Sequence, residues 1–90
     1  ALAGNAAIEA GNATRAVRLA PYSSQAWKLL GDTRHGSGDL LGAAAAYRQA
    51  TRLDPNDWSA WVALASVERG EPRRSALAEA ARLNPRSGGP

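Results

Sequence analysis

Two anchors recur along this chain at one spacing, and they constrain its fold more than any other feature. The pattern Arg-Leu-x-Pro closes three segments, at residues 18–21, 52–55 and 82–85. Pro55 follows Pro21 by the same number of positions as Trp61 follows Trp27. Because two independent anchors share one period, the sequence predicts an internal repeat. Pro85 follows Pro55 more closely than Pro55 follows Pro21, so the final unit is expected to be shortened.

The residues between the anchors have a helical period. Leu40, Ala43, Tyr47, Ala50 and Leu53 fall on one face of a helix, at intervals of three and four residues. Alanine is abundant, and it is the best helix-forming residue. We therefore expect an all-α fold built from antiparallel helix hairpins.

Glycine, proline and capping residues delimit the predicted helices. Gly36-Ser37-Gly38 breaks the chain, and Asp39 is placed to cap the helix that follows. Asp54-Pro55 ends that helix, because the residue before a proline is driven out of the α region. The predicted units are a half-repeat helix at 5–19, which Gly11-Asn12 weakens, a full repeat at 24–53, and a shortened repeat at 58–83 with a helix break at Gly70. Together they form one domain, residues 1–86, and residues 87–90 are expected to be a flexible tail.

The phrases that follow the two tryptophans resemble the tetratricopeptide repeat, a helix–turn–helix unit of about 34 residues. Arg34 stands where that family has an aromatic residue, so the packing there is an open point. The resemblance implies about five helices stacked as a short right-handed superhelix. The positions that match the family signature are Trp27, Leu30, Gly31, Ala43, Tyr47, Ala50 and Pro55 in the full unit, and Trp61, Leu64, Ala65, Leu77, Ala80 and Pro85 in the shortened one.

In the resembled family, the first helices of successive units line a concave groove that holds an extended peptide or a partner helix. Carried over by position, the groove residues are Gln25, Lys28, Asp32 and His35 in one unit, and Ser59, Val62, Ser66 and Arg69 in the next. Asp32 stands where family members that grip a terminal carboxylate have Asn, so binding of chaperone tails is not expected. Trp58 precedes the signature tryptophan, and we expect it to cover the turn between units; exposure at a binding surface is the alternative.

The residues for catalysis or metal binding are few. His35 is the only histidine and cysteine is absent, so neither a thiolate site nor a histidine cluster can form within this sequence. Ser23-Ser24 is better placed as a helix cap than as a nucleophile, and Gly36-Ser37-Gly38 lacks the Lys-Ser/Thr ending of a phosphate loop. We therefore predict no enzymatic activity, no cofactor and no metal.

The charge balance leaves one rival function open. Eleven basic and eight acidic residues give a net charge of +3, which is compatible with a nucleic-acid-binding helical domain. The arginines are spread along the chain, and only Arg73 and Arg74 are adjacent, so we favour a solvated surface.

A second rival concerns a longer parent protein. The Ala/Arg-rich style, with Pro-Tyr-Ser-Ser, Asp-Trp-Ser-Ala-Trp and Arg-Leu-Asn-Pro, is similar to the soluble C-terminal region of actinobacterial membrane proteins related to O-antigen ligases and polymerases. The start at Ala1, without an initiator Met, is expected for a bacterial domain fragment or a processed chain. The sequence leaves the compartment open between the cytoplasm and the soluble part of a membrane protein.

The favoured prediction is a non-enzymatic protein–protein interaction module that binds a peptide or partner helix. Stacks of this kind need about three units to be stable alone, so the open helix faces are expected to allow a homodimer. No stretch reaches the roughly 20 apolar residues of a membrane span, so the segment itself is not expected to contact a membrane.

Overall fold

The computed structural model describes residues 2–84, with side chains described from residue 11 onward. Pro85 of the predicted signature and the predicted tail at 87–90 lie outside the described residues. Within the described part the secondary structure is entirely helical, as the all-α prediction requires. The helices are α1 (Leu2–Leu19), α2 (Ser24–Gly36), α3 (Leu40–Leu53), α4 (Trp58–Val67) and α5 (Gly70–Leu83).

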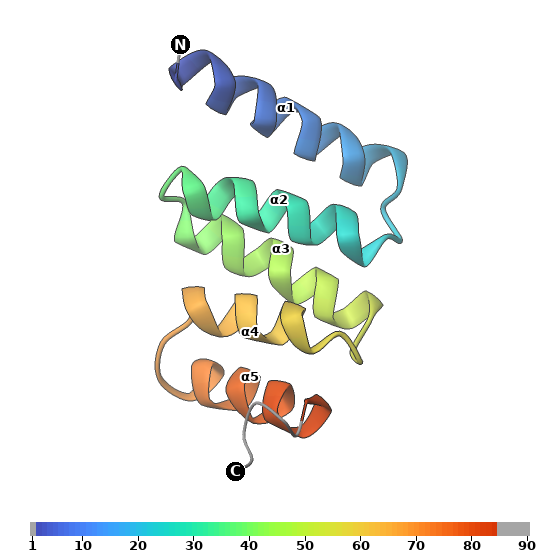
Figure 1. Ribbon diagram of the computed structural model, residues 1–90, viewed down its shortest axis with the longest axis vertical. Coiled ribbons are helices and arrows are strands. Elements are labelled where there is room, and N and C mark those ends of the chain that lie inside the picture. Colours follow the sequence, from blue (N-terminus) through green and yellow to red (C-terminus); the bar gives the residue numbers. More distant parts are fainter. Residues whose placement is uncertain (1, 85–90) are drawn as a thin grey trace.

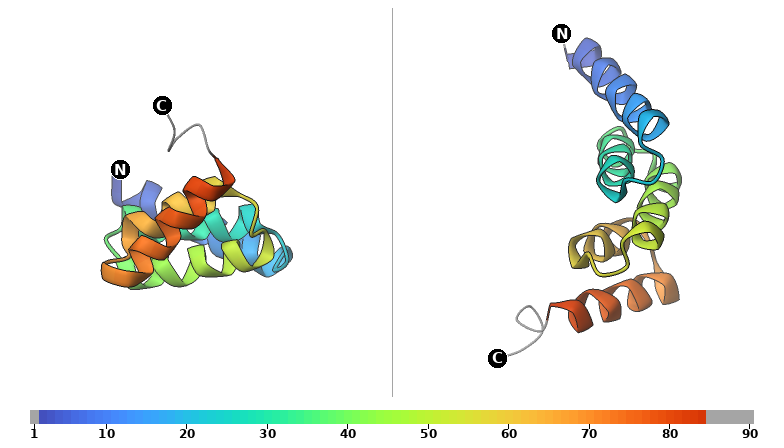
Figure 2. Two further views of the ribbon diagram at one scale, coloured as in Figure 1. Left: turned by 90° about the horizontal axis from the view of Figure 1, so that it is seen from below. Right: turned by 90° about the vertical axis from the view of Figure 1, so that its right-hand side faces the viewer.

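The five helices follow one another along the long axis of a body that measures 44 × 24 × 22 Å (Figure 1). The extensive contacts join consecutive helices, α1 with α2, α2 with α3, α3 with α4, and α4 with α5. Seen from the side, α2 and α4 lie in one layer and α3 lies in the other (Figure 2). This one-dimensional stacking of hairpins is what a helical repeat produces, because each unit is covered only by its neighbours.

Short polar side chains cap the N-termini of three of the helices. Ser23, Asp39 and Asp57 cap α2, α3 and α4, and each side chain accepts a hydrogen bond from a backbone N–H of the first turn. The turn before Asp39 contains Gly38 with φ of 87°, a left-handed conformation that strongly favours glycine. The turns that precede these helices are thus encoded locally, by caps and by one glycine.

Three helix boundaries differ from the predicted ones. α1 runs without a break through Gly11-Asn12 and begins at Leu2 rather than at residue 5. α4 ends at Val67, before the break predicted at Gly70, and Gly70 is the first residue of α5. Glu68 and Arg69 are both extended, which allows a tight connection between α4 and α5.

The core consists of two clusters of small residues around a few large ones. Ala13, Leu30 and Ala46 join α1, α2 and α3, with Trp27 packed against them. The larger cluster, centred on Tyr47 and Leu64, joins α3, α4 and α5 through Ala43, Ala44, Ala65 and Ala76. Because most core residues are alanine, the helices approach closely and the tyrosine ring fills the remaining space.

The closest approach is between Gly31 of α2 and the ring of Tyr47 on α3. A Cβ atom placed on Gly31 would lie 2.4 Å from Tyr47 Cε1, far inside van der Waals contact. Tyr47 is 2 % exposed, so its ring has no free direction in which to move. α2 and α3 can therefore pack this closely only because Gly31 has no side chain.

Candidate functional site

Seven of the eight residues that the resemblance assigns to a groove lie on α2 and α4, which form one layer of the stack (Figure 2), and Arg69 lies in the connection from α4 to α5. Six of the eight are exposed, namely Gln25, Asp32, His35, Val62, Ser66 and Arg69. Lys28 and Ser59 are instead partly buried, since they bond to one another. The surface offered to a partner is therefore smaller than the predicted set.

Lys28 ties α2 to the start of α4. Its Nζ donates to Asp57 Oδ2 and to Ser59 Oγ, both at 2.8 Å. Burial opposes ionisation of Asp57, but the hydrogen bonds from Lys28 and Ser59 outweigh it and lower the pKa of the Asp57 carboxyl. Since the Lys28 ammonium is engaged within the chain, its first role is to hold the two units in register.

Asp32 is the acidic group of this surface. Tyr47 Oη donates to Asp32 Oδ1 at 2.5 Å, which connects α2 to α3. Burial of the phenol, together with the bond to Asp32 and its negative charge, raises the pKa of Tyr47 well above its usual range. No ion pair with Asp32 occurs in the described part of the chain. One carboxylate oxygen of Asp32 thus remains available to a donor from outside.

Arg34 replaces an aromatic contact with a polar one. Its Nη1 donates to the backbone carbonyl oxygen of Gly42 at 3.1 Å, between α2 and the first turn of α3. A Cβ atom on Gly42 would lie 2.2 Å from Asp39 Oδ2 and 3.0 Å from Arg34 Cδ. Where the resembled family has an aromatic contact, Arg34 therefore makes a hydrogen bond. The absence of a side chain at Gly42 leaves room for it.

α4 presents a short apolar strip on the same layer. Trp58 and Val62 are one helical turn apart and are 43 % and 41 % exposed. Ser66 lies one turn further along α4 and is exposed, and Arg69, in the connection from α4 to α5, is exposed as well. The exposure of Trp58 favours the alternative in which it belongs to a binding surface over the one in which it only covers a turn.

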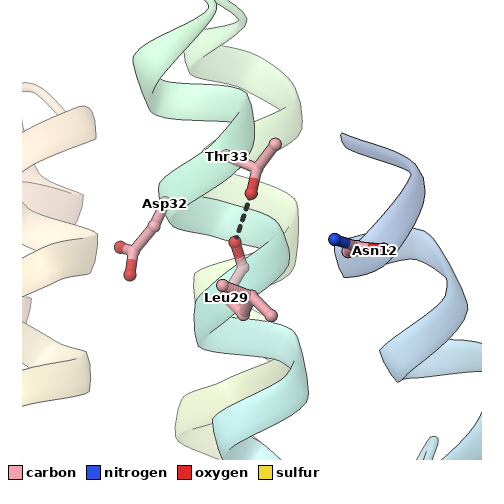
Figure 3. Close-up of a pocket in the computed structure, with 4 residues that line it drawn as sticks. All are labelled: Asn12, Leu29, Asp32 and Thr33. Carbon is pink, nitrogen blue, oxygen red and sulfur yellow. Dashed lines mark hydrogen bonds between the residues drawn. The ribbon is translucent and has the colours of Figure 1, made fainter. Parts of the chain in front are cut away.

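A hollow of about 370 Å³ opens between α1 and α2, and the sequence motifs do not predict it. Asn12 of α1 lines it together with Leu29, Asp32 and Thr33 of α2 (Figure 3). Thr33 Oγ1 donates to the Leu29 carbonyl oxygen at 2.9 Å, so that hydroxyl is already engaged, and the Asp32 side chain points away from Asn12. The only signal for the hollow in the sequence is a large residue, Leu29, at a position that the signature does not use.

The described residues offer little for metal chemistry or membrane insertion. His35 is exposed near the end of α2. Between residues 2 and 84 no group of three or more histidine or acidic side chains could hold a metal ion. No helix in that same range is long and apolar enough to cross a membrane.

Several of the arginines are paired within the chain. Arg48 on α3 contacts Glu68 at the end of α4, while Arg74 and Arg82 pair with Glu71 and Glu79 along α5. These pairs neutralise cations on separate parts of the stack rather than gathering them. The three pairs therefore offset part of the positive charge on α3 and α5.

Part of this chain is similar in sequence to known proteins. Residues 24–67, which hold α2, α3 and α4, match the family model of the tetratricopeptide repeat. Superkiller protein 3 of Schizosaccharomyces pombe is 35 % identical over 54 residues. That match covers 60 % of this chain but spans only 4 % of the yeast protein's length.

The helical geometry and these matches are consistent with an all-α helical repeat that is similar to the tetratricopeptide repeat. Tetratricopeptide repeats generally mediate protein–protein interaction, and they are generally not enzymes. Neither match supports the resemblance to O-antigen ligases, nor a role in binding nucleic acid.

Proposed function

We propose that this chain is a non-enzymatic interaction module that binds an extended segment of a partner protein across α2 and α4. One observation carries the proposal: the exposed apolar pair Trp58 and Val62 lies in the same layer as the exposed polar side chains of α2. Interaction surfaces commonly combine an apolar anchor, tryptophan above all, with polar groups at the rim.

The charges of this face indicate which segments would bind. The free oxygen of Asp32 accepts hydrogen bonds and repels a terminal carboxylate. Trp58 and Val62 offer contact to a large apolar side chain of the bound segment. We therefore expect an internal segment that carries an apolar residue and a lysine or arginine, rather than an acidic C-terminal tail.

The proposal is tested by selecting binders from a displayed library of random peptides with the folded chain as bait. We expect the selected peptides to combine apolar and basic residues. The affinity of a synthetic representative should fall about tenfold or more for Val62→Glu, since a charge replaces the apolar contact. Leu41→Glu, an exposed position on α3 away from this face, is the matched control.

Lys28 is left unchanged in this test, because its loss would loosen α2 from α4 and confuse folding with binding. Circular dichroism should show equal helicity for the wild type, Val62→Glu and Leu41→Glu. Peptides that bind Val62→Glu and Trp58→Ala as tightly as the wild type would contradict the proposed face. Failure to select any peptide would contradict peptide binding altogether.

We infer that any homodimer forms through the outer face of α5. Leu77 is the large apolar side chain exposed there. Sedimentation equilibrium should show association that weakens on Leu77→Glu. A monomer mass that is independent of concentration would contradict self-association.

A further inference from the structure

Asp32 presents a negative charge to solvent on the peptide-binding face proposed above. It is exposed, and its side chain points to the side of α2 opposite to α1 (Figure 3). Asp32 takes part in no ion pair among the side chains that the structure describes. A cation that binds this carboxylate is therefore expected to come from the bound segment.

Two donors of the same face are already engaged within the chain. Lys28 lies one turn before Asp32 on α2. Its Nζ donates to Asp57 and Ser59 instead, both at 2.8 Å. Ser66 holds the equivalent place to Asp32 on α4, one repeat further along the chain, and its hydroxyl donates at 2.6 Å to a carbonyl oxygen of its own helix. Neither side chain neutralises Asp32.

Tyr47 holds the carboxylate of Asp32 from the buried side. Its Oη donates to Asp32 Oδ1 at 2.5 Å, and its ring is 2 % exposed and lies against Gly31. Burial of the phenol, the bond to Asp32 and the negative charge there raise the pKa of Tyr47 well above its usual range, so the hydroxyl keeps its proton at neutral pH. Oδ1 is therefore committed to a donor that packing holds in place, whereas Oδ2 is left for a partner.

We propose that Asp32 binds a lysine of the partner segment in preference to an arginine, and that Tyr47 is the positioning residue that sets this preference. The inference rests on the proposed function, in which the basic residue of the segment is either lysine or arginine. It names the primary ammonium group as the chemistry that this face recognises, and Asp32 Oδ2 as the atom that receives it.

The preference follows from the number of oxygens that each side chain uses. An arginine guanidinium binds a carboxylate most strongly as a fork, with parallel hydrogen bonds to both oxygens. At Asp32 the second of these bonds would share Oδ1 with the Tyr47 hydroxyl, so the fork loses much of its advantage. A lysine ammonium is compact and needs only one oxygen, which Oδ2 provides.

The Tyr47 hydroxyl also orients Asp32 before a segment binds. A side chain that is held in its bound position beforehand loses less conformational freedom on binding. Removal of the hydroxyl therefore acts in opposite directions on the two ligands. Lysine loses a pre-oriented oxygen, whereas arginine gains access to both oxygens. The ratio of the two affinities is thus the sensitive readout.

Three forms of one peptide test the proposal. A peptide selected with the folded chain is synthesised with lysine, arginine or norleucine at its basic position, and each form is acetylated, amidated and fluorescently labelled. Fluorescence anisotropy with the wild-type chain should show about threefold or more tighter binding of the lysine form than of the arginine form. The norleucine form keeps the aliphatic stem without the charge, and it should bind about tenfold or more weakly than the lysine form.

Variants of the chain locate the preference. Tyr47→Phe keeps the ring against Gly31 and removes the hydroxyl, so the lysine-to-arginine ratio of affinities should fall to about one or below. Tyr22→Phe makes the same change at an exposed tyrosine and should keep the wild-type ratio. Asp32→Asn removes the charge and should reduce the lysine-to-norleucine ratio to less than about threefold. Because each ratio is measured on one variant, a smaller folded fraction cancels from it.

Four outcomes would overturn the proposal. They are equal binding of the lysine and arginine forms by the wild type, an unchanged ratio in Tyr47→Phe, a lysine preference that persists in Asp32→Asn, and selected peptides without any basic residue. If binding in these cases still depends on Val62, the proposed function stands and this inference alone fails. The absence of any binding peptide would contradict both. Recovery of the lost affinity by a norleucine peptide with a free N-terminus would assign the site to a terminal amine instead of a lysine.

Discussion

Trp27 and Trp61 make the same hydrogen bond in successive units of the stack. The indole Nε1–H of Trp27 donates to the carbonyl oxygen of Pro21 at 2.7 Å, and that of Trp61 donates to the carbonyl oxygen of Pro55 at 2.9 Å. Both rings are partly rather than fully buried. The two anchors recognised in the sequence, the tryptophans and the prolines, are therefore bonded to each other, which explains why they share one spacing.

Loss of the Trp27 ring should destabilise the domain strongly. We expect Trp27→Ala to lower the free energy of unfolding by about 3 kcal/mol, because it removes packing against the cluster of Ala13, Leu30 and Ala46. Trp27→Phe keeps most of the packing and should cost about 1 kcal/mol for the lost hydrogen bond. Urea denaturation followed by circular dichroism measures both. The exposed Trp58 is the control, and an equal loss for Trp58→Ala would contradict the unequal roles of the two residues.

Substitution of Gly31 should be costly, although alanine is the better helix former. The added Cβ would collide with the buried Tyr47 ring, so we expect Gly31→Ala to destabilise the fold by about 1–3 kcal/mol. Gly11 lies in the middle of α1 with nothing within 4 Å of an added Cβ, and Gly11→Ala should stabilise by up to about 1 kcal/mol. Thermal melting of the two variants gives opposite shifts in Tm. Shifts of the same sign would argue against the close contact.

The Lys28–Asp57 pair should contribute more than an exposed ion pair. Its side chains are only 19 % and 17 % exposed, and Lys28→Met leaves the Asp57 carboxylate partly buried with one donor fewer. We expect a loss of about 1–2 kcal/mol in the free energy of unfolding. The exposed pair of Arg74 and Glu71 is the comparison, and Arg74→Met should cost less than about 0.5 kcal/mol. Chemical denaturation at low and high salt separates the two cases.

Asp57 also gives stability a dependence on acidic pH. Its pKa is lowered in the folded state, so the unfolded chain binds the proton more readily. The contribution of Asp57 is therefore present above the ordinary aspartate pKa of about 3.9 and is lost as pH falls through the folded value. Denaturation curves from acidic to neutral pH should show a smaller decline for Asp57→Asn than for the wild type. An identical decline would mean that Asp57 is not the titrating group.

Tyr47 should resist ionisation in the folded protein. Since its pKa is raised, the stability that the neutral phenol provides is present below the ordinary tyrosine pKa of about 10 and is lost as pH rises toward the folded value. The difference in ultraviolet absorbance between the wild type and Tyr47→Phe during an alkaline titration isolates this group. We expect its absorbance change only well above the ordinary tyrosine pKa. A change at that ordinary value in a chain that is still helical would contradict the bond to Asp32.

The fold class was predictable because its determinants are local. Alanine content and apolar positions at intervals of three and four residues favour helices, and Asp39 caps the helix that it precedes in the sequence. The resemblance of the spaced tryptophans and prolines to the tetratricopeptide repeat then indicated how the helices stack. The helix ends near Gly11-Asn12 and Gly70 were less predictable, because packing against a neighbouring helix outweighs a small difference in helix propensity.

The candidate site was predictable only as a set of positions. Five exposed residues of the predicted set lie on α2 and α4, namely Gln25, Asp32, His35, Val62 and Ser66, and exposed Arg69 lies just beyond α4. The partners of Lys28, which lie 29 and 31 residues further along the chain, could not be deduced from the helical period. The period assigns a residue to a face of its helix, but side-chain pairing across helices also depends on their axial offset and crossing angle.

The sequence by itself determined that this chain forms helices, where most of them begin, and that one unit repeats with the spacing of Trp27 and Trp61. Only the tertiary structure decided that Arg34 bonds to the Gly42 carbonyl and that the Tyr47 ring lies against Gly31. The physical reason is that caps, turns and faces depend on neighbours in the chain. Volume at a contact between helices depends on both surfaces together.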